Sequence, residues 1–125
     1  MFLLKEILIV DDSLFMRRHL RNILIESNYR EIIEAENGMD AIHKYKIYSP
    51  EIVLMDITMP VLNGMDALKE IINIDPQAKV IICSSLGGQQ IIIKEAIKIG
   101  AIDFVVKPHF HNLVAIVNKH FTLNT

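Results

Sequence analysis

The chain has only one cysteine, Cys83, and no apolar segment long enough to anchor it in a membrane. A single cysteine excludes an intramolecular disulfide, which is typical of proteins that work in a reducing compartment. The apolar start at residues 1–4 is interrupted by Lys5 and Glu6, far short of the roughly 20 apolar residues of a membrane span. It also lacks the pattern of a signal peptide. We therefore expect a cytoplasmic protein without a membrane partner.

The chain also lacks an excess of positive charge, internal repeats and low-complexity segments. Its formal net charge is −2 and its isoelectric point is near 6.2, whereas proteins that bind nucleic-acid backbones carry a basic face. We therefore expect no binding to DNA. With 51% hydrophobic and 22% charged residues, the 125-residue chain has the composition of one globular domain. No segment is typical of an internal linker, so we expect residues 1–125 to form a single unit.

Short apolar segments alternate with amphipathic segments along the chain. The apolar segments are rich in β-branched residues without polar alternation, which is typical of parallel strands buried on both faces. The pattern predicts strands at residues 6–10, 32–35, 52–55, 79–83 and 102–106. It predicts helices from a Ser13 cap to about residue 26, and at residues 39–48, 65–74, 89–99 and 112–121. This alternation predicts an α/β fold, a doubly wound five-stranded parallel sheet with helices on both faces.

Charged residues follow three of the predicted strands. Asp11-Asp12 come after the first strand, Asp56 after the third, and Lys107-Pro108 after the fifth. Open α/β sheets bind ligands at the carboxyl ends of their strands, so we expect these side chains to converge. Carboxylates are ligands that Mg²⁺ prefers, and a lysine ammonium suits a phosphoryl oxygen. The set therefore predicts a divalent metal next to a phosphoryl group.

Asp56 is the best placed of these carboxylates to accept a phosphoryl group. It stands alone at the end of a buried strand, and a carboxylate can act as a nucleophile to form an aspartyl phosphate. Phosphohydrolases resembling the haloacid dehalogenase group share this intermediate, but they need a second carboxylate two positions later, where this chain has Thr58. A nucleotide-binding domain is also disfavoured, because Asp11-Asp12-Ser13 replaces the glycine-rich first turn and would repel a pyrophosphate.

Six short segments in this order form a specific set that spans nearly the whole chain. They are Ile7-Leu8-Ile9-Val10-Asp11-Asp12-Ser13, Met55-Asp56-Ile57-Thr58-Met59-Pro60, Asn63-Gly64, Cys83-Ser84-Ser85, Gly100-Ala101 and Asp103-Phe104-Val105-Val106-Lys107-Pro108. The set resembles the receiver domains of two-component response regulators, most closely the stand-alone chemotaxis members. The resemblance implies a flavodoxin-like (βα)5 fold with strand order 2-1-3-4-5. We expect no output domain, because the chain ends almost where the last predicted helix ends.

The resemblance also implies which residues do the chemistry. A histidine kinase would transfer its phosphoryl group to Asp56. Asp11, Asp12 and Asp56 would bind Mg²⁺ together with the backbone carbonyl of Thr58, and Asp12 would do so more directly than Asp11. Lys107 would pair with a phosphoryl oxygen.

A switch pair, Ser84 and Phe104, is implied in the same way. In receivers, a hydroxyl after the fourth strand binds the phosphoryl group, and an aromatic side chain on the fifth strand changes its burial in response. Ser85 is an alternative for the hydroxyl, because the interval to Lys107 is one residue longer than in compact chemotaxis members. Gly87-Gly88 is the expected insertion.

The predicted helix at residues 89–99 carries a broad apolar stripe for the core, consisting of Ile92, Ile93, Ala96, Ile97 and Ile99. Ile91 falls outside the stripe among charged residues, so we expect it to be exposed. In receivers this helix, the fifth strand and the last helix form the output face. Ile91 and Phe104 are therefore candidates for a partner-binding surface.

The resemblance implies a signalling switch rather than an enzyme, one that catalyses only its own phosphorylation and dephosphorylation. We expect a monomeric chemotaxis response regulator that uses Mg²⁺. Its expected partners are a histidine kinase and a downstream protein such as the flagellar motor switch. The alternative is a stand-alone phosphorelay intermediate that passes its phosphoryl group to a histidine phosphotransfer protein.

Overall fold

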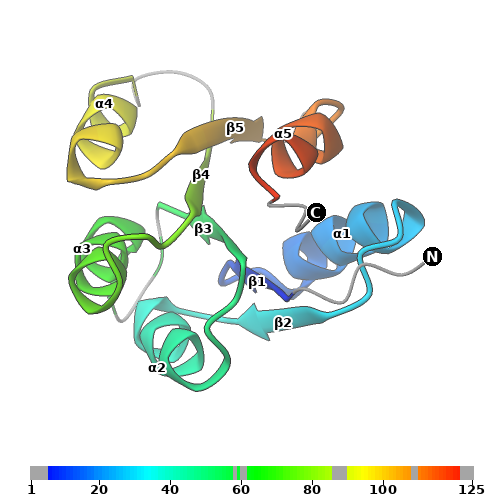
Figure 1. The fold of residues 1–125 in the computed structure, drawn as a ribbon. Helices are drawn as coiled ribbons and strands as arrows, with labels where there is room; N and C mark the ends of the chain where they lie inside the picture. The colour runs from blue at the N-terminus through cyan, green and yellow to red at the C-terminus, as the bar shows by residue number, and fades with distance from the viewer. Residues whose placement is uncertain (1–5, 58, 60–61, 86–89, 108–109, 122–125) are drawn as a thin grey trace.

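A computed structural model of the chain describes residues 6–57, 59, 62–85, 90–107 and 110–121 (Figure 1). Strands and helices alternate in the order β1 (Ile7–Val10), α1 (Leu14–Glu26), β2 (Ile32–Ala35), α2 (Gly38–Tyr48), β3 (Ile52–Asp56), α3 (Gly64–Ile74), β4 (Val80–Ser85), α4 (Gln90–Ile99), β5 (Asp103–Lys107) and α5 (Leu113–His120). All strand pairs are parallel, and the sheet order is β2-β1-β3-β4-β5. The predicted fold class and strand order are confirmed.

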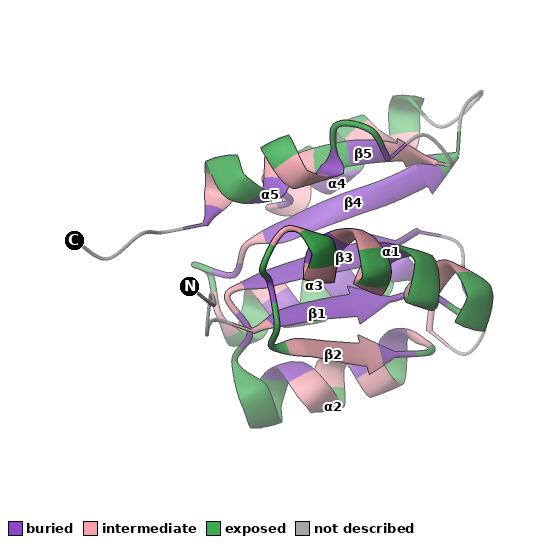
Figure 2. Cartoon of the chain, turned by 90° about the vertical axis from the view of Figure 1, so that its right-hand side faces the viewer, coloured by how far each residue is buried: buried purple, intermediate pink, exposed green. Residues whose placement is uncertain are grey.

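The sheet lies between two layers of helices. Helices α1 and α5 cover one face, and helices α2, α3 and α4 cover the other (Figure 1). Neighbouring residues of a strand point to opposite faces of the sheet. Ile9 therefore belongs to the hydrophobic core under α1 and α5, and Val10 belongs to the core under α2, α3 and α4. The central strands are buried throughout (Figure 2). This two-sided burial explains why their sequences are uninterrupted apolar segments and gives the strand ends a rigid support.

The strands near the carboxyl edge of the sheet extend further than predicted. Strand β3 ends at Asp56 rather than residue 55, β4 ends at Ser85 rather than residue 83, and β5 ends at Lys107 rather than residue 106. The reason is pairing between strands, since Ser85 pairs with Lys107 and thereby brings polar residues into the hydrogen-bonded ladder. Asp56 and Lys107 therefore belong to ordered strands, whereas Asp11 and Asp12 directly follow β1.

The helices are short, and their observed boundaries agree with the predicted ones to within about one residue. The longest, α1, has 13 residues and begins at the predicted Ser13 cap, whose hydroxyl accepts a hydrogen bond from the Met16 backbone at 3.1 Å. Within the described ranges, no helix combines the length and apolar character required to cross a bilayer.

Candidate functional site

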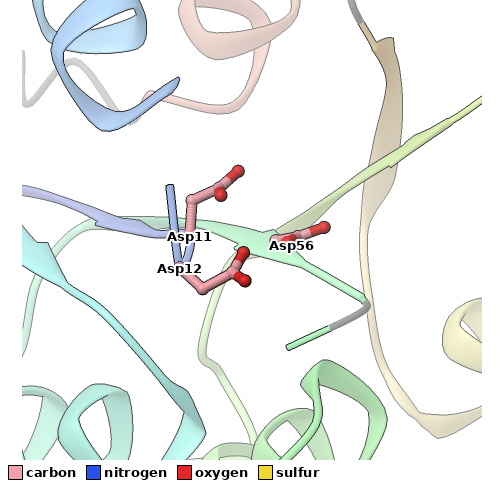
Figure 3. Close-up of side chains that lie close together, drawn as sticks. All are labelled: Asp11, Asp12 and Asp56. Atoms are coloured by element: carbon pink, nitrogen blue, oxygen red, sulfur yellow. The ribbon is translucent and has the colours of Figure 1, made fainter. Parts of the chain in front are cut away.

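Asp11, Asp12 and Asp56 lie together at the carboxyl edge of the sheet (Figure 3). Asp11 and Asp12 directly follow β1, and Asp56 is the last residue of the neighbouring strand β3. One carboxylate oxygen from each of the three residues lies within 4.8 Å of the other two. Asp11 and Asp56 are buried whereas Asp12 is exposed, so Asp12 is the carboxylate on the solvent side of this acidic cluster.

Lys107 joins the buried part of the acidic cluster. Its ammonium lies 2.7 Å from Asp11 Oδ2 and 3.0 Å from Asp56 Oδ1. Burial lowers the pKa of Lys107, but the hydrogen bond to Asp11 and the charges of Asp56 and Asp11 outweigh it, so the pKa is raised above its ordinary value. The lysine therefore stays charged and holds the two buried carboxylates close to each other.

The chemistry of this donor set fits Mg²⁺. Three carboxylates opposed by one ammonium leave an excess of negative charge, and like charges held this close repel one another. A small divalent cation with hard oxygen ligands relieves that repulsion. Thr58, whose backbone carbonyl was predicted to join these ligands, lies outside the described residues, as do Pro108 and the expected insertion at Gly87-Gly88.

A close backbone contact at Gly64 fixes the start of α3 next to Asp56. The Gly64 amide donates a hydrogen bond to the Ile57 carbonyl at 2.8 Å. A Cβ atom at this position would lie 2.1 Å from the backbone oxygen of Asp56, so only glycine permits the approach. The adjacent Asn63 caps the helix by accepting a hydrogen bond from the Asp66 amide at 3.0 Å. Gly64 thus fixes the backbone next to the candidate phosphoacceptor, and Asn63 only caps the helix that begins there.

The two candidate switch serines have different environments. Ser84 is buried, and its hydroxyl donates a long hydrogen bond of 3.4 Å to the Ser85 carbonyl, whereas Ser85 is exposed. Ser84 pairs with Val106, which is two residues from Phe104 on β5, so Ser84 and Phe104 face the same side of the sheet. Ser85 pairs with Lys107 and faces the opposite side. This geometry favours Ser84 over Ser85 as the partner of Phe104.

Helix α4 and β5 present exposed apolar side chains. Ile91 is 73% exposed, as predicted, and Phe104 is 41% exposed. The prediction that Ile97 belongs to the core stripe is wrong, because its side chain is 45% exposed. Only Ala96 of this helix is fully buried among the described residues, since α4 covers the edge of the sheet and can bury only a narrow face. The periodicity of the sequence does not show how many apolar residues of α4 the neighbouring elements can bury.

One further residue, Arg17, contacts the acidic cluster, and no sequence motif pointed to it. From the first turns of α1, Arg17 Nη1 donates a hydrogen bond of 2.8 Å to the backbone carbonyl of Asp11. Its Nε donates to Glu34 of β2 at 3.0 Å. The only indication in the sequence was a basic residue in the helix that follows Asp11-Asp12. Arg17 binds a backbone carbonyl, and no sequence pattern specifies such a contact.

Comparison with known protein sequences places the chain among signalling proteins. The family model described as "Response regulator receiver domain" matches residues 7–118. The chain is 56% identical over 104 residues to the chemotaxis protein CheY of Thermotoga maritima, covering 83% of this chain and 86% of that protein. It is 50% identical over 119 residues to CheY of Bacillus subtilis, covering 94% of this chain and 97% of that protein.

Solved structures show the same architecture. A structure of a CheX–CheY–BeF3–Mg²⁺ complex from Borrelia burgdorferi matches with a TM-score of 0.88 and 34% identity, covering 95% of this chain and 90% of that one. The response regulator domain of CheB from Thermotoga maritima matches with a TM-score of 0.86 and 33% identity, covering 97% of this chain and 98% of that one.

Proposed function

This chain belongs to the response regulator receiver domain family, and we propose that it is a phosphorylation-activated switch in chemotaxis. A histidine kinase donates the phosphoryl group, Asp56 accepts it, and the protein-binding face at α4 and β5 changes in response. The observation that supports this most directly is the position of Asp56, which ends a buried strand within reach of Lys107, Asp11 and Asp12. The similarity to proteins named CheY supports the chemotaxis role.

The residues of the site divide the transfer chemistry between them. A carboxylate oxygen of Asp56 forms a bond to phosphorus while the bond between phosphorus and the kinase histidine breaks, and the electron pair stays on the histidine nitrogen. Lys107, which starts 3.0 Å from Asp56 Oδ1, then pairs with a phosphoryl oxygen. Asp11, Asp12 and Asp56, with the Thr58 carbonyl, would hold Mg²⁺, which supplies counter-charge to the phosphoryl oxygens. The chain catalyses only its own phosphorylation and dephosphorylation.

Phosphorylation changes the output face through Ser84 and Phe104. The new group adds about 1.5 to 2 negative charges and three acceptor oxygens to Asp56. The long hydrogen bond of the Ser84 hydroxyl, 3.4 Å, is easily exchanged for a stronger one to a phosphoryl oxygen. The movement of Ser84 frees space on the side of the sheet that Ser84 and Phe104 both face. The Phe104 ring then turns inward. Its burial removes apolar surface from the face that also carries Ile91.

Residues 1–125 act as a single receiver domain and as a monomer, without binding DNA. The partners are a histidine kinase and a downstream protein, such as the flagellar motor switch. The Borrelia complex, which contains CheX together with CheY, supports a protein as the partner of this fold. The alternative is a stand-alone phosphorelay intermediate that uses the same site and passes its phosphoryl group to a histidine phosphotransfer protein.

Phosphorylation and partner capture test the proposal together. Acetyl phosphate with Mg²⁺ should add one phosphoryl group per chain, measured by intact mass, and Asp56→Asn should abolish the addition. Undiminished labelling of Asp56→Asn would reject the assignment of the phosphoacceptor. A pull-down with the phosphorylated protein should then recover flagellar switch components. Recovery of histidine phosphotransfer proteins instead would favour the phosphorelay alternative.

A further inference from the structure

Arg17 holds the peptide group that links two residues of the acidic cluster. The β1 ladder with its neighbours ends at Val10, and the Asp11 amide still donates to the Ala35 carbonyl at 3.1 Å. The Asp11 carbonyl lies beyond this ladder, and Arg17 Nη1 donates to it at 2.8 Å. This carbonyl belongs to the same peptide group as the Asp12 nitrogen. Its orientation therefore sets the direction in which the Asp12 side chain leaves the backbone.

Arg17 is itself held in place by an ion pair. Its Nε lies 3.0 Å from Glu34 Oε1, and its side chain is only 12% exposed. Arg21, one helical turn further along α1, reaches the other oxygen of Glu34 at 2.8 Å. Lys44 of α2 donates to the backbone carbonyl of Glu34. The guanidinium of Arg17 thus lies between a carboxylate fixed on β2 and the backbone at the end of β1.

The planar guanidinium suits this bridge better than an ammonium does. Its donors have fixed directions, so one nitrogen serves Glu34 while another serves the Asp11 carbonyl. A lysine carries a single point charge on a flexible stem, and its donors rotate freely, so it does not fix these two directions. The carboxylate that pairs with Arg17 is that of Glu34, which lies outside the acidic cluster and also pairs with Arg21.

We infer that Arg17 is a positioning residue for divalent cation binding, acting through the Asp11–Asp12 peptide group. The inference rests on the proposed function, because it assigns Arg17 to the Mg²⁺ site proposed there. Groups that orient direct metal ligands contribute strongly to affinity even though they never touch the metal. Simple electrostatics predicts the opposite sign, because removing a positive charge near the cluster should strengthen cation binding. Weaker Mg²⁺ binding after replacement of Arg17 therefore indicates that the residue acts by positioning the backbone, and tighter binding indicates that it acts through its charge.

The test compares three variants of the full chain in Mg²⁺ titrations without a phosphodonor. Arg17→Ala and Arg17→Lys should each bind Mg²⁺ about tenfold more weakly than the wild type. Arg21→Ala removes the other positive charge that pairs with Glu34 but leaves the contact between Arg17 and the Asp11 carbonyl, so this variant should bind Mg²⁺ as the wild type does. The backbone ¹⁵N resonance of Asp12 in the metal-free protein should shift in both Arg17 variants and stay in place in Arg21→Ala.

The outcomes separate this inference from the proposed function. A wild-type protein that binds no Mg²⁺ would overturn the proposed metal site, whatever Arg17 does. A wild type that binds Mg²⁺, with equal or tighter binding by Arg17→Ala and an unmoved Asp12 resonance, would overturn the role of Arg17 alone. Full affinity in Arg17→Lys would also overturn it, because charge would then suffice. Thermal unfolding of each variant confirms that it is folded at the titration temperature.

Discussion

The ammonium of Lys107 lies 3.0 Å from a carboxylate oxygen of Asp56, although strand β4 separates their strands in the sheet. The same ammonium reaches Asp11 at 2.7 Å, so one residue of the last strand joins the ends of the first and third strands. A phosphoryl group on Asp56 adds negative charge at the point where Lys107 already pairs. We therefore expect Lys107 to pair with a phosphoryl oxygen once Asp56 is phosphorylated.

Lys107→Ala should separate phosphorylation from its consequences. The variant keeps the nucleophile, so it should still accept phosphate from acetyl phosphate, as measured by intact mass. Its phosphorylated form lacks the main counter-charge and should bind the output partner no better than the unphosphorylated protein. Lys46→Ala, a change of an exposed lysine on α2, serves as the control. Normal activation of partner binding in Lys107→Ala would remove the residue from the switch.

Asp12 should matter more than Asp11 for binding Mg²⁺. Both oxygens of Asp11 are already engaged, Oδ2 by Lys107 at 2.7 Å and Oδ1 by the Ser13 amide at 2.9 Å. Asp12 is exposed and lies on the solvent side of the cluster. We expect Asp12→Ala to weaken Mg²⁺ binding about tenfold or more and Asp11→Ala to weaken it less. Titration calorimetry that gave the reverse order would refute this ranking and leave the fold untouched.

Ser84 should couple phosphorylation to Phe104, and Ser85 should not. Ser84 is buried and shares a side of the sheet with Phe104, whereas Ser85 faces the other side. Beryllofluoride with Mg²⁺, a mimic of the phosphoryl group, should move the ring resonances of Phe104 in the wild type and in Ser85→Ala. Ser84→Ala should lose this response but still accept phosphate. Loss of the response in Ser85→Ala alone would assign the hydroxyl role to the neighbouring serine.

Phe104 should show a graded rather than an all-or-none response. Phenylalanine has no hydroxyl, so packing alone holds the inward ring, without a hydrogen bond. We therefore expect NMR to find both ring positions populated in the unphosphorylated protein, with a shifted ratio after phosphorylation. A single ring position before phosphorylation would contradict this expectation.

Gly64→Ala should disturb both stability and phosphorylation. The added Cβ would lie 2.1 Å from the Asp56 oxygen and 2.7 Å from the Ile57 Cα, so the backbone of the phosphoacceptor must move. We expect the free energy of unfolding in urea to fall by about 1 to 3 kcal/mol, with slower labelling by acetyl phosphate. Asn63→Ala is the matched control, because it removes only a helix cap worth about 1 kcal/mol and should leave labelling intact.

The contribution of Asp103 to stability should depend on pH. Burial raises the pKa of Asp103, but the 2.8 Å contact with His120 and the Phe104 amide outweigh it, so the pKa falls below the ordinary 3.8. A lowered carboxyl pKa stabilises the fold above the unfolded-state pKa, and this stabilisation is lost as pH falls through the folded-state value. Asp103→Asn should therefore lower the free energy of unfolding by up to about 1 kcal/mol at neutral pH and by less in acid. A difference in unfolding free energy between wild type and Asp103→Asn that stayed constant down to strongly acidic pH would contradict the lowered pKa of Asp103.

The sequence by itself determined the chemical composition of the candidate site and its place in the fold. Asp11-Asp12, Asp56 and Lys107 each adjoin a β-branched apolar segment, and such segments form buried parallel strands wherever the chain alternates them with helices. Because parallel strands share one carboxyl edge, the local pattern was enough to predict that these side chains meet. The same reasoning predicted the exposure of Ile91, since a residue outside an apolar helical stripe faces solvent.

Only the tertiary structure decided relations between segments that are distant along the chain. Pairing with β5 extended β4 to Ser85 and set the sides on which Ser84 and Ser85 point, and no local propensity contains that register. The edge position of α4 left Ile97 exposed, because the surface available for burial depends on neighbouring elements. The hydrogen bond from Arg17 to the Asp11 carbonyl exists because α1 packs back over the end of β1. Backbone atoms are the same at every position, so a contact to one of them is visible only in three dimensions.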